Sequence, residues 1–128
     1  MVLSGLDVQK FTKGILEDEP KVLFVALVES RADTVLANEI RKGASLYYPA
    51  QYLHDFVMIA PAIVIGALEK LKPALGAITS VTVRYERRVL LFSRCEDMIV
   101  VLGFEESIPT PFADRMAELI RRVARESE

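Results

Sequence analysis

The chain has 128 residues, with 16 Lys or Arg against 18 Asp or Glu, so its net charge is −2. Proteins built mainly to bind nucleic acid carry a clear basic excess, so we expect no nucleic-acid partner. The length predicts one domain, residues 1–128, around one core. The mean hydropathy of +0.27 is high for a chain with 27% charged residues. We therefore expect a second copy or a partner to cover part of the apolar surface.

Cys95 is the only cysteine, which excludes an internal disulfide and a cysteine metal site. The first residues lack the basic start and long apolar run that are typical of a signal peptide. These features predict a cytoplasmic protein. The charge-free run over residues 56–68 is shorter than the roughly 20 apolar residues that a membrane helix needs, so we expect no membrane span.

The first part of the chain predicts a helix and a hairpin. An apolar stripe with helical spacing covers residues 4–17, which Ser4 can cap and Pro20 ends. Apolar and β-branched residues then fill positions 21–30, which predicts a buried strand. A more polar strand is predicted over residues 34–43, and the short polar break between the two strands favours a hairpin.

The stretch "YYPAQYLHDFVMIAPAIVIGALEKLKP" predicts the longest helix. Pro49 suits its first turn, helical spacing continues to Leu71, and Pro73 is expected to stop it. That length corresponds to about 35 Å of helix. Pro61 removes one helical hydrogen bond, so we expect a bend there.

Three strands and a last helix complete the prediction. The strands cover residues 77–86, 87–94 and 97–104, and their short links favour an antiparallel meander. Thr110 and Pro111 suit the start of the final helix. Its predicted buried face consists of Phe112, Met116, Leu119, Ile120 and Val123. The order α-β-β-α-β-β-β-α predicts an α+β fold, a five-stranded antiparallel sheet with helices on both faces.

This pattern resembles the roadblock/LC7 family and the wider profilin-like group. The resemblance rests on the leading helix before "VLFVALVES", the hairpin into "TVLA", the long apolar helix, and the meander "VTVRYERRVLLFSRCEDMIVVLGF" followed by a helix. It implies a non-enzymatic interaction module. Roadblock-like proteins form dimers in which the long helices pack together and the sheets often join at their edges. Many are scaffolds or regulators of small GTPases, and some prokaryotic relatives stimulate GTP hydrolysis.

The central helix is apolar on two faces, so two surfaces must cover it. One explanation is that the two end helices fold over its second face. Another is a homodimer interface, for which we predict five residues: Tyr52, Phe56, Ile59, Ile63 and Gly66. Its aromatic residues would act as anchors and its glycine would permit close approach of another backbone. A third is an apolar pocket beside Pro61 that holds a small ligand.

No constellation of residues indicates catalysis or a cofactor. His54 and Asp55 are adjacent, so on a helix they point about 100° apart and cannot form a catalytic pair. Cys95 is expected in a turn, without an identifiable base. Around the meander, acids such as Glu86, Glu96 and Asp97 are interleaved with Arg84, Arg87, Arg88 and Arg94, which favours a solvated surface. No nucleotide-binding glycine motif is present, so we expect no cofactor and no metal.

The sequence thus predicts a homodimer that acts as a scaffold or regulator of a small GTPase. The alternative hypothesis is a small-molecule sensor or carrier that uses the apolar pocket. An enzyme comes third, because no acid–base or nucleophile constellation is present.

Overall fold

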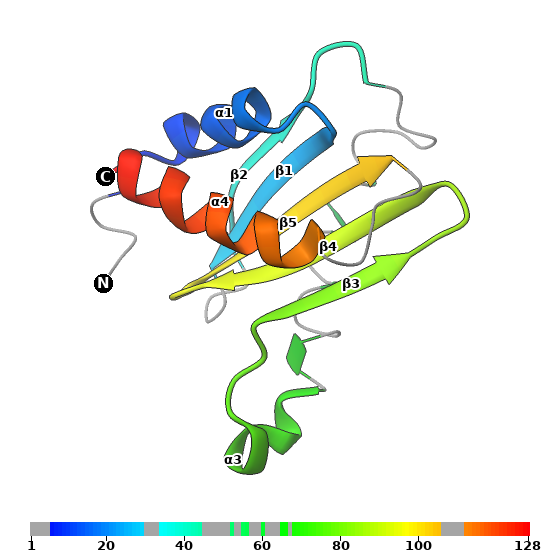
Figure 1. The fold of residues 1–128 in the computed structure, drawn as a ribbon, viewed down its shortest axis with the longest axis vertical. Coiled ribbons are helices and arrows are strands. Elements are labelled where there is room, and N and C mark those ends of the chain that lie inside the picture. Colours follow the sequence, from blue (N-terminus) through cyan, green and yellow to red (C-terminus); the bar gives the residue numbers. More distant parts are fainter. Residues whose placement is uncertain are drawn as a thin grey trace.

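The computed structural model describes residues 6–29, 34–44, 52, 55–56, 60, 65–66, 68–105 and 112–128. Figure 1 shows one antiparallel sheet with strand order β2-β1-β5-β4-β3. The strands are β1 Val22–Glu29, β2 Thr34–Ile40, β3 Ser80–Arg84, β4 Arg88–Cys95 and β5 Met98–Glu105. The helices are α1 Val8–Asp18, the 3₁₀ turn η2 Glu69–Leu71, α3 Lys72–Leu75 and α4 Phe112–Glu126. The predicted strands and the meander β3-β4-β5 are confirmed.

The sheet is buried on both faces at its centre. The side chains of β1 from Val22 to Val28 are all buried, and so are those of β5 from Met98 to Phe104. Such continuous apolar runs arise because alternate side chains enter two different cores. The edge strands β2 and β3 have more exposed side chains.

The helices α1 and α4 cover one face of the sheet (Figure 1). Phe11 and Ile15 of α1 meet Met116 and Ile120 of α4 over the sheet residues of that core. The opposite core contains Phe24, Phe92 and Val101 with Ala60 and Ile65. Ala60 and Ile65 have helical backbone, as do the other described residues between positions 52 and 68. The predicted fold, with helices on both faces of a five-stranded antiparallel sheet, is confirmed.

The first helix starts later than the apolar stripe predicted. Helix α1 begins at Val8, and the side chain of Asp7 accepts a hydrogen bond from the Lys10 amide at 3.1 Å. Asp7 is therefore the N-cap, because a carboxylate there satisfies an amide that has no partner within the helix. The predicted cap, Ser4, lies outside the described residues.

Arg41, just after β2, holds the other end of α1. Its Nη2 donates to the carbonyls of Leu16 at 2.6 Å and Glu19 at 3.0 Å, and its Nε donates to Val22 at 2.8 Å. A guanidinium is suited to this role because its donors fan out in one plane and its charge favours a helix C-terminus. No periodicity or motif in the sequence marks this residue.

Pro73 does not end the helical path, which corrects the prediction. The chain passes through η2 into α3, where Pro73 occupies the first turn and needs no hydrogen-bond donor. Helical structure ends at Gly76, whose φ of 82° favours glycine. The path therefore extends to Leu75 instead of Leu71.

Cys95 is also placed differently from the prediction. It is the last residue of β4 and pairs with Met98, so the two-residue turn consists of Glu96 and Asp97. Glu96 has a φ of 53°, the left-handed conformation that tight hairpins often require. Within the described parts of the chain, no helix is long and apolar enough to cross a membrane.

Candidate interaction surfaces

The structure describes three of the five predicted interface residues. Tyr52 is 62% exposed, and Gly66 is exposed. Among the described residues outside its own helix backbone and chain neighbours, no heavy atom lies within 4 Å of where a Cβ of Gly66 would be. Phe56 is half-buried, and its ring centroid lies 6.3 Å from that of Phe92 on β4. Phe56 therefore contacts its own sheet. Ile59 and Ile63 lie outside the described residues, as do His54 and the predicted bend and ligand pocket at Pro61.

The end helices do not cover the outer side of this helical segment. Helices α1 and α4 pack on the opposite face of the sheet from Phe56, Ala60 and Ile65. The explanation that α1 and α4 fold over the second face is therefore wrong. The exposed Tyr52 and Gly66 remain available to another molecule.

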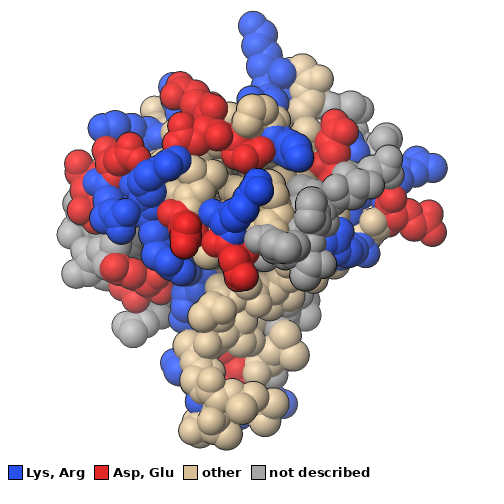
Figure 2. All heavy atoms as spheres, viewed as in Figure 1, with Lys and Arg blue, Asp and Glu red and all other residues tan. Residues whose placement is uncertain are grey.

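An apolar arm, residues 68–75, continues from this segment and projects past β3 (Figure 1). Its leucines are strongly exposed: Leu68 by 55%, Leu71 by 62% and Leu75 by 76%. In the view of Figure 2 the projecting part is mostly uncharged, with a few charged side chains, whereas the body above it is densely charged. Three exposed leucines on one short projection are unusual for a surface in water. Exposed apolar patches of this kind mark contact sites. The sequence pattern extended the predicted helix only to Leu71, and the expected stop at Pro73 concealed Leu75.

An ion pair holds the base of the arm against the sheet. The carboxylate of Glu69 binds Nη2 of Arg94 on β4. The amide of Arg94 also donates to the carbonyl of Thr79 at 2.9 Å. Both charged side chains are largely shielded, at 24% and 23% exposure, so water screens their attraction less than on an open surface. This contact fixes the direction in which the arm leaves the body.

Strand β3 forms one edge of the described sheet, next to the arm. It pairs with β4 on one side only, from Ser80 opposite Ser93 to Arg84 opposite Val89. An edge strand presents backbone donors and acceptors to any strand that approaches it. The arm and the β3 edge thus offer apolar contact and backbone pairing side by side.

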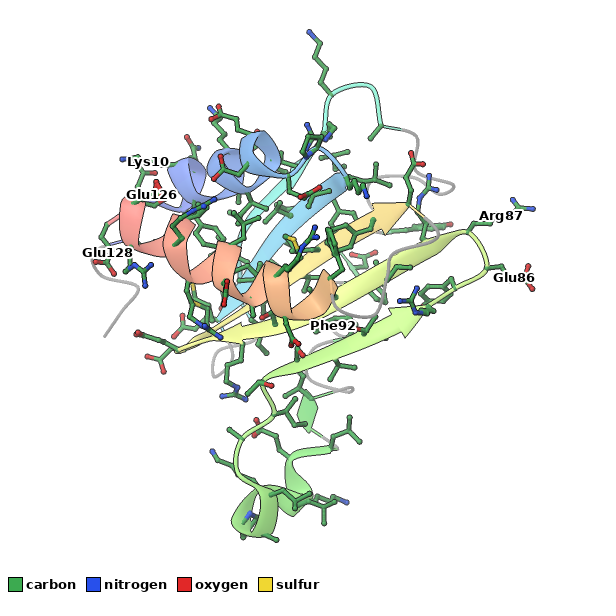
Figure 3. The ribbon with its side chains drawn as sticks, in the orientation of Figure 1. Lys10, Glu86, Arg87, Phe92, Glu126 and Glu128 are labelled. Carbon is green, nitrogen blue, oxygen red and sulfur yellow. The ribbon has the colours of Figure 1, made fainter. Side chains whose placement is uncertain are left out.

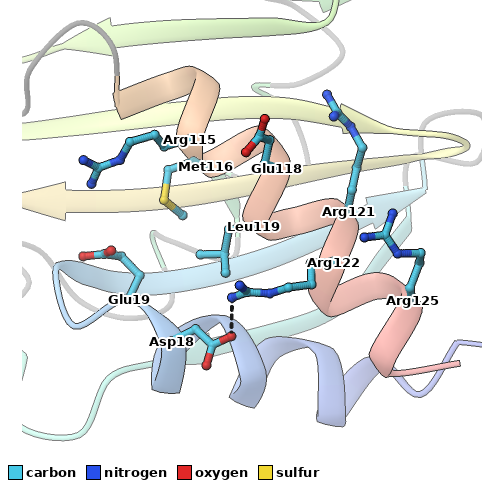
Figure 4. Close-up of a pocket in the computed structure, with 9 residues that line it drawn as sticks. All are labelled: Asp18, Glu19, Arg115, Met116, Glu118, Leu119, Arg121, Arg122 and Arg125. Carbon is cyan, nitrogen blue, oxygen red and sulfur yellow. Dashed lines mark hydrogen bonds and ion pairs between the residues drawn. The ribbon is translucent and has the colours of Figure 1, made fainter.

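A groove of about 410 Å³ lies along the outer side of α4, facing the end of α1 (Figure 4). Its lining consists of Asp18, Glu19, Arg115, Met116, Glu118, Leu119, Arg121, Arg122 and Arg125. Arg122 donates to Asp18 at 2.8 Å and approaches Glu126 at 3.5 Å. Met116 is buried and Leu119 half-buried, so charged side chains make up most of the exposed lining. The sequence places these arginines on one helix but does not show that some of them face α1.

Arg87 and Arg94 of the meander do not share one surface. Arg87 projects outward at the turn between β3 and β4, beside Glu86 (Figure 3). Arg94 is instead largely shielded and bound to Glu69.

Cys95 is buried, with 8% exposure. Burial raises the pKa of its thiol, Glu96 raises it further, and Arg121 lowers it. A raised pKa keeps the thiol protonated at neutral pH, which is the opposite of what a nucleophile needs. Among the residues that the structure describes, no group of three His, Cys, Asp or Glu could hold a metal ion.

Comparison with known proteins places this fold among roadblock/LC7 domain structures. The sequence matches no protein-family model, and the comparison with curated proteins gives no significant match. The gliding protein MglB of Thermus thermophilus is 23% identical, with 92% of this chain and 88% of that chain covered and a TM-score of 0.62. MglB of Myxococcus xanthus is 11% identical, with 94% and 89% covered and a TM-score of 0.67. A Streptomyces avermitilis roadblock/LC7 domain is 14% identical, with 91% and 93% covered and a TM-score of 0.63. The resemblance to the roadblock/LC7 architecture is thus confirmed at the level of the fold.

Proposed function

We propose that this chain is a single-domain, non-enzymatic module that forms a homodimer and regulates a small GTPase in the cytoplasm. The observation that carries the proposal is the apolar arm, whose three exposed leucines lie next to β3, the edge strand of the described sheet, in a roadblock/LC7 fold. A copy that pairs through its own β3 would lie against the arm. Leu68, Leu71 and Leu75 would then be removed from water, which is favourable in proportion to the area covered.

The homodimer accounts for two unusual features together. It gives the edge of β3 a partner strand, and it covers the outer side of the helical segment that carries Tyr52 and Gly66. A solved structure of MglB is described as having a tetrameric arrangement, so self-association occurs among proteins of this fold. The GTPase role rests on the resemblance to roadblock-like regulators.

Light scattering on the purified protein tests the dimer. We expect twice the 14.3 kDa chain mass at micromolar concentration. Leu71→Asp should give the mass of one chain, because it places a charge in an apolar contact. Leu71 is a sharper choice than Phe56, whose ring also packs within its own protomer. Gln9→Asp adds the same charge on α1, on the other face of the sheet, and should remain dimeric. A Leu71→Asp protein that stays dimeric would show that the arm is not the contact.

Purified small GTPases from the same organism test the partner. We expect one of them to bind the wild-type dimer with an affinity that depends on whether GDP or a GTP analogue is bound. The rate of single-turnover GTP hydrolysis or of nucleotide release by that GTPase should then change when the dimer is added. If none of them binds in either nucleotide state, the proposed GTPase role is wrong.

A further inference from the structure

The hydrogen bonds of β3 show which of its backbone groups a second strand would meet. The Tyr85 amide donates to the carbonyl of Arg88 at 2.8 Å, and the carbonyl of Thr79 accepts from the Arg94 amide at 2.9 Å. Odd-numbered positions along β3 therefore bond to β4. Because backbone groups alternate in direction along a strand, the even-numbered positions, with Thr82 at their centre, direct their amides and carbonyls away from β4.

This pattern restricts how two copies of β3 can pair. In a two-fold dimer each copy presents the same edge to the other, so the two strands run antiparallel. All five residues of β3, Ser80–Arg84, find an opposite residue in only one register, in which Thr82 lies on the two-fold axis. The backbone permits this register, because the axis then relates two residues whose hydrogen-bonding groups point outward. It sets Thr79 of one copy opposite Tyr85 of the other.

The arm and Tyr85 belong to the same face of the sheet. Val83 packs against the core that contains Phe92. By strand alternation, Tyr85, two positions further along, is directed to that face as well. The arm also leaves from this face, because Ile65 before it and Ile78 after it pack in the same core. A two-fold axis perpendicular to a continuous sheet keeps this face on one side in both copies, so the arm of one copy and Tyr85 of the other share a surface.

The exposed apolar side chains are confined to this region. Among the described residues, five large apolar side chains are strongly exposed, and they are Tyr52, Leu68, Leu71, Leu75 and Tyr85. The first four lie on the central helical segment and the arm, and Tyr85 directly follows β3. Figure 1 shows the arm extending beyond the outer edge of β3, where a second copy would lie. The chain thus carries both sides of an apolar contact, which favours a second copy as the occupant.

We propose that, in the homodimer, Tyr85 of the partner copy packs on Leu71 and Leu75 of the arm, with Thr82 on the two-fold axis. This inference rests on the proposed homodimer and adds the contact that fixes its register. Each arm contact is incomplete in one chain, because its aromatic side comes from the second copy. A chain of the same fold without an apolar residue at this position would leave the arm leucines in water, so the contact favours self-association over pairing with such a chain.

Disulfide cross-linking tests the register. In a Cys95→Ala background, Thr82→Cys places two thiols opposite each other across the axis, at a Cα separation of about 5.5 Å that a disulfide can span. We expect rapid oxidation to a covalent dimer, seen by non-reducing electrophoresis. Ser80→Cys is the matched control, because this residue is also exposed on β3. In the proposed register its two copies are offset by about 13 Å along the strands and should not cross-link.

Analytical ultracentrifugation tests the contact between the arm and Tyr85. Tyr85→Ala and Leu75→Ala should each weaken the dimer by at least about tenfold, because each removes an apolar contact that is buried only in the dimer. Since the two side chains touch, Tyr85→Ala should weaken the dimer much less when Leu75→Ala is already present. Tyr85→Phe keeps the ring and should remain within about threefold of the wild type. Circular dichroism on the same samples checks that each variant is folded.

The outcomes separate this contact from the dimer itself. A monomeric wild type would overturn both. A wild-type dimer in which Thr82→Cys does not cross-link, or in which Ser80→Cys does, would overturn the register and leave the dimer standing. A dimer that is unaffected by Tyr85→Ala, or additive effects of Tyr85→Ala and Leu75→Ala, would show that the partner's Tyr85 does not cover the arm.

Discussion

Cys95 shows how neighbours on two elements set the chemistry of one residue. Burial and Glu96 raise the pKa of its thiol above the usual 9.0, whereas Arg121, reaching from α4, lowers it. We expect slow alkylation by iodoacetamide at neutral pH, with a rate that rises as the solution passes above pH 9.0. Glu96→Gln should shift this rate profile to lower pH and Arg121→Gln to higher pH. Identical profiles for both variants would contradict this account of the site.

The raised pKa of the Cys95 thiol also makes the stability of the fold depend on pH. The folded thiol keeps its proton to higher pH than the unfolded thiol, so its contribution is fully present below the unfolded pKa. It is lost as pH rises through the folded pKa. Ionisation of Cys95 therefore lowers the stability of the fold in alkaline solution and has no such effect in acid.

At the scale of elements, Arg41 joins the end of β2 to the end of α1. It donates to three carbonyls, and two of them, those of Leu16 and Glu19, lie at the C-terminal end of α1, where carbonyls have no amide partner within the helix. We expect Arg41→Met to lower the free energy of unfolding by about 1–3 kcal/mol, because buried carbonyls lose a charged donor. Urea unfolding measures this change. Lys42→Met, at the exposed next position, should change stability by no more than about 0.5 kcal/mol; equal effects of the two changes would exclude the proposed role of Arg41.

Most of the helices and strands were predictable from the sequence, and each feature that was predicted wrongly or missed has a specific physical cause. The strands were predicted because runs such as that of β1 enter two cores and must be apolar throughout. Helix α4 was predicted because its apolar residues recur at the helical period. Pro73 was misread because a proline ends one helix and also suits the first turn of the next. Arg41 and the Glu69–Arg94 pair were missed because long-range polar contacts leave no periodic signal.

At the scale of the whole molecule, self-association should appear in the stability. A protein that is folded as a dimer unfolds at a temperature that rises with concentration, by mass action. We expect this rise for the wild-type protein and a constant midpoint for Leu71→Asp. Differential scanning calorimetry over a wide concentration range measures both. A wild-type midpoint that does not depend on concentration would contradict the dimer proposed from the arm and β3.

The position of β5 in the sheet has a further consequence for how the molecule folds. β1 pairs with β2, and β4 pairs with β3, through neighbouring parts of the chain. Within the described sheet, only β5 connects these two hairpins, because it lies between β1 and β4. The β1–β5 pair joins segments that are distant in the sequence, and such pairs form slowly because a long loop must close first. During synthesis, neither core can therefore be completed before β5, the last described strand in the sequence, has left the ribosome.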